Sequence, residues 1–165
     1  RRWFHFRSQM HREFIKSSAF VIKKFFPQRP IYSHQIPVPD NHYIYKGRDF
    51  ASPQSTAIIE GLRPGFTFYI YSKRDQEQKL MIREIYKKSK GPWGFMEFNP
   101  GKNWKEGKTS LKEYTYEIIS YAHQYGVRSI APLSWQSNSL DTAVKGSGID
   151  EGIKLFLNEG PLKVD

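Results

Sequence analysis

The chain lacks cysteine altogether. This absence excludes both a disulfide framework and a zinc site built on thiolates. The sequence also lacks an apolar run of the roughly 20 residues that a membrane-spanning helix requires, so we predict no such helix. Its first residue is Arg1 rather than a methionine, from which we expect that a leader or an upstream domain has been removed.

Several common catalytic motifs are missing as well. The sequence contains no Gly-x-Ser-x-Gly element, which argues against a serine hydrolase with that nucleophile turn. It contains neither type of glycine-rich loop that binds nucleotide phosphates. It also lacks His-Glu-x-x-His or a comparable spacing of ligands, so we predict no metal site.

Positive charge is abundant but unevenly distributed. The formal net charge is +10, and residues 1–29 supply +7 of it from eight basic side chains and one acidic side chain. The rest of the chain carries 18 basic and 15 acidic residues. A protein that wraps nucleic acid usually spreads basic residues over its working face. We therefore expect an N-terminal arm that meets phosphates, on RNA or on an anionic membrane surface, and a body that need not do so.

The arm itself has the pattern of one amphipathic helix over residues 3–26, which Pro27 ends. At 100° per residue, one broad side collects the apolar residues Trp3, Phe4, Met10, Phe14, Ile15, Val21, Ile22, Phe25 and Phe26. The other side collects Arg2, Arg12, Lys16, Lys23 and Lys24. This pattern fits a packed helix with a solvated basic face, a membrane-surface helix, an RNA-contacting arm or a linker to an upstream domain.

Residues 30–165 are predicted to form a single α+β domain. The periodicity predicts four strands, at residues 43–46, 66–71, 93–98 and 127–135. Helix signals predict four further helices, at residues 52–61, 75–88, 110–126 and 149–158. Residues 27–41 are rich in proline and are interpreted as a connector. Aromatic alternation and the proline-rich flanks favour a mixed, largely antiparallel sheet flanked by helices.

Two sets of carboxylates qualify as candidate sites. Glu97 is predicted to share a strand face with Trp93 and Phe95, where an unpaired carboxylate is costly to bury. It is therefore expected either at an edge of the sheet or in a functional role. Glu113 and Glu117 lie one turn apart on the predicted helix 110–126, opposite its apolar side, and are interpreted as a solvated face.

The segment YIYKGRDFASPQSTAIIEGLRPG, which starts at Tyr43, resembles the start of the ADP-ribosyltransferase family, and the resemblance extends over about residues 43–98. It implies an NAD-cleaving or ADP-ribosylating domain, such as a toxin or effector, with a protein or nucleic-acid acceptor. The implied catalytic residues are Glu97 and Ser72, and the implied NAD-binding residues are Tyr45, Lys46, Arg48 and Tyr71. The sequence departs from the family pattern because Lys46 replaces an arginine or histidine, the Ser-Thr-Ser element is reduced to Ser72, and no Gln/Glu-x-Glu pair is present.

The alternative is an RNA-contacting module. Its candidate contacts are His42, Lys46, Arg48, Lys73 and Arg74, with aromatic rings for base stacking. A metal-free ribonuclease would use His42 and Glu97 as its acid and base. A non-catalytic accessory subunit of a ribonucleoprotein or membrane assembly would need only the basic helix for docking. A toxin would be secreted or delivered as an effector, and the other functions would be intracellular.

Overall fold

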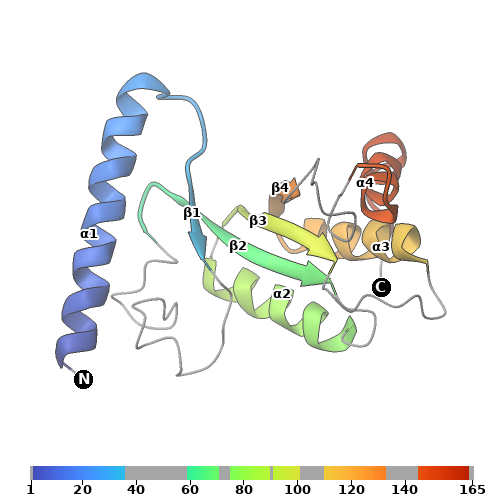
Figure 1. Ribbon diagram of the computed structural model, residues 1–165, viewed down its shortest axis with the longest axis horizontal. Helices are drawn as coiled ribbons and strands as arrows, with labels where there is room; N and C mark the ends of the chain where they lie inside the picture. Colours follow the sequence, from blue (N-terminus) through green and yellow to red (C-terminus); the bar gives the residue numbers. More distant parts are fainter. Residues whose placement is uncertain are drawn as a thin grey trace.

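The computed structural model describes residues 2–35, 59–70, 75–89, 91–100, 110–132 and 145–163. Within these ranges it contains, in chain order, α1 (Arg2–Phe25), β1 (Tyr32–Gln35), β2 (Arg63–Ile70), α2 (Asp75–Ser89), β3 (Trp93–Pro100), α3 (Leu111–Gln124), β4 (Val127–Pro132) and α4 (Gly148–Glu159). Figure 1 shows this arrangement. None of the helices described is both long enough and apolar enough to cross a membrane.

The sheet is parallel throughout, in the order β1-β2-β3-β4. The prediction of a mixed, largely antiparallel sheet is therefore wrong, and the fold is α/β. Helices α2 and α3 carry the chain from the end of one strand back to the start of the next, which is the crossover that parallel neighbours require. The aromatic alternation that suggested antiparallel strands arises from the difference between the two faces of the sheet. One face packs on helices, and the other carries polar residues.

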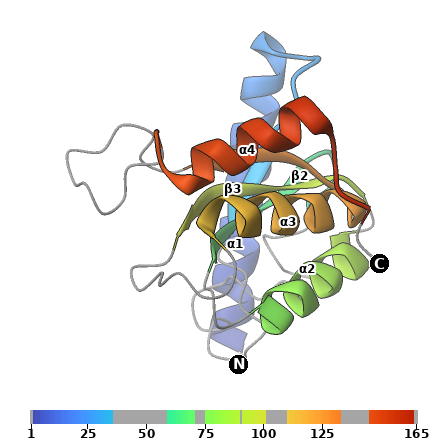
Figure 2. The same ribbon diagram turned by 90° about the vertical axis from the view of Figure 1, so that its right-hand side faces the viewer.

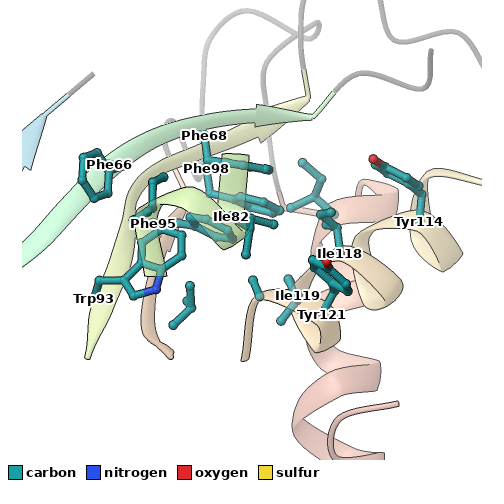
Figure 3. Packing of buried hydrophobic residues seen from close by; sticks show 14 residues of the cluster. Phe66, Phe68, Ile82, Trp93, Phe95, Phe98, Tyr114, Ile118, Ile119 and Tyr121 are labelled. Carbon is teal, nitrogen blue, oxygen red and sulfur yellow. The ribbon is translucent and has the colours of Figure 1, made fainter. Parts of the chain in front are cut away.

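The core lies between the sheet and the helices. In Figure 2, α3 lies between α2 and α4. Figure 3 shows aromatic side chains of β2 and β3 projecting toward isoleucines of α2 and α3. The largest side chains that are almost wholly buried are Trp93, Phe66, Phe68, Phe95 and Phe98. Burying each such side chain contributes roughly 1.5–3 kcal/mol, so this layer accounts for much of the stability of the body.

Several elements agree with the predictions made from local sequence signals. Helix α1 agrees with the predicted helix 3–26 to within one residue at each end. The predicted capping box of α3 is present, since Ser110 accepts from the Glu113 N–H and the Glu113 carboxylate accepts from the Ser110 N–H. Strand β1 was missed because it falls in the predicted connector. The predicted strand 43–46 and residues 52–58 of the predicted helix 52–61 lie outside the described residues, and residues 59–61 are not helical.

Helix α4 packs closely on α3 because glycine faces the contact. A Cβ atom on Gly152 would lie 2.6 Å from Thr115 Cβ and 2.7 Å from the Lys112 carbonyl oxygen. The Lys112 atom belongs to helix backbone, and Thr115 is stiff about χ1 in a helix. These contacts leave no room for an alanine side chain.

Gly152→Ala should therefore destabilise the protein by about 1–3 kcal/mol through overpacking. Helix propensity alone predicts the opposite sign, with a gain of up to about 1 kcal/mol. Urea unfolding measures the difference. Gly91→Ala is the control, because the nearest atom to its added Cβ is the Ser89 carbonyl oxygen at 4.0 Å. A stabilised Gly152→Ala variant would show that α3 and α4 do not pack in this way.

Asp150 holds the first turn of α4. Its carboxylate accepts from the Gly146 N–H at 3.0 Å and from Lys154 Nζ at 2.9 Å. The hydrogen bond from Lys154, followed by that from Gly146, lowers the pKa of Asp150. A lowered pKa means that the folded state favours the carboxylate, so this stabilisation is complete above the unfolded-state pKa and is lost as the pH falls through the folded-state pKa.

Thermal unfolding of the parent chain and of Asp150→Asn tests this dependence. The parent should have the higher melting temperature at neutral pH, and the difference should shrink as the pH falls below about 4, the usual range of an aspartate. A difference that stays constant down to strong acid would contradict the assigned hydrogen bonds.

Candidate active site

The sheet face opposite the helices carries a polar cluster from three adjacent strands. We call this side the polar face and define it by His34 of β1, Thr67 of β2 and Glu97 of β3. Thr67 Oγ1 lies 2.8 Å from His34 Nε2 and 3.1 Å from Glu97 Oε2. His34 Nε2 lies 3.8 Å from the same carboxylate oxygen.

A register shift between β2 and β3 turns Glu97 onto this face. Phe66 pairs with Phe95, but the next residue, Thr67, pairs with Glu97. Met96 is thus one extra residue in β3, as in a β-bulge. Simple alternation would put Glu97 on the same side as Phe95, and the extra residue reverses this. The prediction that Glu97 shares a face with Trp93 and Phe95 is therefore wrong.

Two glycines make room for the bulge. A Cβ atom on Gly65 would lie 2.3 Å from Met96 Cγ, and one on Gly94 would lie 2.6 Å from Met96 Cε. The Met96 side chain thus covers both glycines on the polar face. Because these positions carry no side chain, the Met96 side chain has room to lie over them.

The hydrogen bonds fix the direction in which protons are donated. Thr67 has one hydroxyl proton and donates it to Glu97. His34 Nε2 must then carry the proton of its own bond to Thr67 Oγ1. The result is a chain from His34 through Thr67 to Glu97, in which the carboxylate is the final acceptor. This arrangement holds the Glu97 carboxylate in a fixed orientation.

The cluster is reachable from solvent but not fully exposed. Thr67 is 9% exposed, whereas the side chains of Glu97 and His34 are 20% and 44% exposed. Glu97 is thus partly shielded from solvent, and His34 is the most exposed member of the cluster. Partial burial also strengthens the electrostatic effect of a carboxylate on a bound substrate.

A second polar cluster joins α2 to α3. Lys79 Nζ lies 2.6 Å from Glu117 and 3.2 Å from Asp75, so Glu117, whose side chain is 36% exposed, forms an ion pair between the two helices. The Tyr114 hydroxyl lies 2.7 Å from Gln78 Oε1 and 3.1 Å from Asp75 Oδ1, so its one proton is shared between these acceptors. Burial, followed by the charge of Asp75, raises the pKa of Tyr114. Burial lowers the pKa of Lys79, but Glu117 and Asp75 outweigh it and the net shift is upward. Lys79 stays charged, so this cluster acts as an interhelical tie and is a poor source of a base.

Among the predicted site residues, Glu97 is the one that the structure describes. Tyr45, Lys46, Arg48, Tyr71 and Ser72 lie outside the described residues, as do His42, Lys73 and Arg74 of the RNA hypothesis. His34 and Thr67 were not predicted. The available signal for Thr67 was a polar residue between two core phenylalanines, but only the strand pairing connects it to Glu97.

The chemistry of the polar face suits an organic substrate better than a metal ion. Within the ranges described, no group of three or more acidic, histidine or cysteine residues could hold a metal ion. The polar face supplies one carboxylate, one imidazole and one hydroxyl, which suits hydrogen bonding to an organic substrate. In comparisons with known proteins, no family model, no curated protein and no solved structure matches the chain.

Proposed function

We propose that the chain is an enzyme that breaks the bond between nicotinamide and ribose in NAD, and that Glu97 is its catalytic carboxylate. The observation that carries the proposal is the position of Glu97 on the polar face, oriented by Thr67 and partly shielded from water. The resemblance of residues 43–98 to ADP-ribosyltransferases supports the choice of NAD over other substrates with a glycosidic bond.

The chemistry of this bond matches a site built around one carboxylate. Nicotinamide is bonded to ribose as a pyridinium cation, so it leaves as a neutral ring and needs no proton from a general acid. The transition state places positive charge on the ribose, and a fixed carboxylate stabilises that charge. Hydrolysis of an ordinary O-glycoside, by contrast, usually requires a second carboxyl group as the acid.

Each residue of the cluster has a distinct role in this proposal. Glu97 faces the ribose and stabilises the developing charge. Thr67 is a positioning residue, because its hydroxyl proton fixes one carboxylate oxygen. His34 donates to Thr67 and is the most exposed of the three, so its ring borders the route by which substrate enters. Water or a nucleophile on a protein or nucleic acid then attacks the ribose and takes the ADP-ribosyl group.

Incubation of the pure chain with NAD, with and without a mixture of proteins and RNA, tests the proposal. Chromatography should detect free nicotinamide, together with ADP-ribose or an ADP-ribosylated acceptor. Release of nicotinamide without a modified acceptor would assign hydrolysis, and a modified acceptor would assign transfer. Intact NAD beside cleaved RNA or a cleaved O-glycoside would overturn the proposal.

A further inference from the structure

Helix α1 presents an apolar row to solvent. Five large apolar side chains on one side of this helix are each more than half exposed: Trp3, Met10, Phe14, Val21 and Phe25. At 100° per residue they fall within a sector about 60° wide that runs the length of the helix and that also contains Arg7. We call these five residues the apolar row. Single exposed apolar residues are ordinary, but five of them aligned along one side of a helix mark an interaction surface.

The body of the protein contacts the other side of the helix. Ala19 alone is buried among the α1 side chains that the structure describes. Lys16, Ala19 and Lys23 line a depression of about 250 Å³ together with Ile59 and Leu62 of the segment that enters β2. Figure 1 shows α1 beside β1 and apart from the other helices. The helix is thus held on its Ala19 side, and the apolar row faces away from the body.

We propose that α1 binds the surface of an anionic lipid membrane, lying in the plane of the interface with the apolar row inserted. A helix with aromatic and aliphatic residues on one side and lysine and arginine on the other has the composition of an interfacial helix. At about 1.5 Å per residue, its 24 residues would extend over roughly 36 Å of membrane surface. The apolar side chains enter the acyl boundary. Lys24, which is exposed beside the row and does not line the depression, remains among the headgroups.

Charge and apolar surface together favour an anionic membrane over RNA or a second copy of the chain as the partner of α1. Residues 1–29 carry a net charge of +7, which attracts phosphate headgroups and repels a second copy of the same arm. RNA would also attract this charge, but it would leave the apolar row in water. An anionic bilayer is the partner that satisfies both the basic residues and the apolar row. The inference is independent of the NAD proposal, because it uses no residue of the polar face.

Vesicle flotation tests the proposal with the full chain. Binding should be at least about tenfold stronger to vesicles of phosphatidylcholine mixed with phosphatidylglycerol than to phosphatidylcholine alone, and it should weaken as salt is added. Phe14→Asp should reduce binding to the anionic vesicles by about tenfold or more, because it places a charge in the inserted row. Lys24→Gln should reduce the same binding by about fivefold.

Leu157→Asp is the matched control, because Leu157 of α4 is 73% exposed, close to the 69% of Phe14, and the substitution changes the charge by the same amount. It should leave vesicle binding and the circular dichroism spectrum unchanged. Equal binding to both kinds of vesicle, or an equal loss in Leu157→Asp, would overturn the proposal. A dimer in light scattering that Phe14→Asp dissociates, or tight binding to RNA without vesicle binding, would assign α1 to another partner.

Discussion

Glu97→Gln should lower the rate of NAD cleavage by about 100- to 10,000-fold, the range found when a charged group that acts in the transition state is removed. Glutamine has nearly the shape of glutamate and keeps an oxygen that can accept from Thr67, so the polar face should remain intact. What is lost is the negative charge that would face the ribose. The loss should therefore appear mainly in kcat, whereas KM for NAD should change little.

Glu113→Gln provides a control with the same chemical change. Glu113 is exposed and belongs to the capping box of α3, and glutamine supports a capping box equally well. This variant should retain the full rate. Melting temperatures of both variants should match that of the parent, which separates a catalytic effect from unfolding. An unchanged rate in Glu97→Gln would remove Glu97 from the chemistry, whatever the protein does with NAD.

The sequence predicted helices better than it predicted the sheet, because helix signals are local. The capping box at Ser110, the proline after α1 and the apolar spacing of α2 and α3 each act within a few residues. Strand direction depends instead on where the chain returns after each helix. Strand β1 escaped prediction because it is only four residues long and follows Pro30 closely.

The candidate site was only partly predictable for the same reason. Glu97 was predictable as a candidate from its sequence position alone, because a carboxylate among aromatic residues is costly to bury. Its neighbours could not be found that way, since Thr67 and His34 meet it only through the pairing of three strands. The extra residue at Met96 then decides which face Glu97 occupies, and a rule of strict alternation cannot anticipate it.

Trp93→Ala should destabilise the protein by about 3–5 kcal/mol, the usual cost of removing a large aromatic side chain from a packed core. Trp93 is fully buried, and its ring meets those of Phe66 and Phe95 edge-on at centroid distances of 5.8 and 5.3 Å. Its indole N–H also donates to the Tyr125 carbonyl at 2.6 Å, so the truncation leaves both a cavity and a buried acceptor. The melting temperature should fall by roughly 6–20 °C, at about 2–4 °C per kcal/mol for a chain of this size.

Trp3→Ala separates the core from the arm. Trp3 is 61% exposed on α1, so its removal should leave the melting temperature within about 1 °C of the parent, as expected of a surface substitution. The same variant should weaken binding to anionic vesicles, because Trp3 belongs to the apolar row. The two alanine variants should therefore show opposite patterns. Trp93→Ala should lower the melting temperature, and Trp3→Ala should lower vesicle binding. Equal losses of stability in the two variants would mean that α1 packs into the body, and the proposed membrane helix would then be wrong.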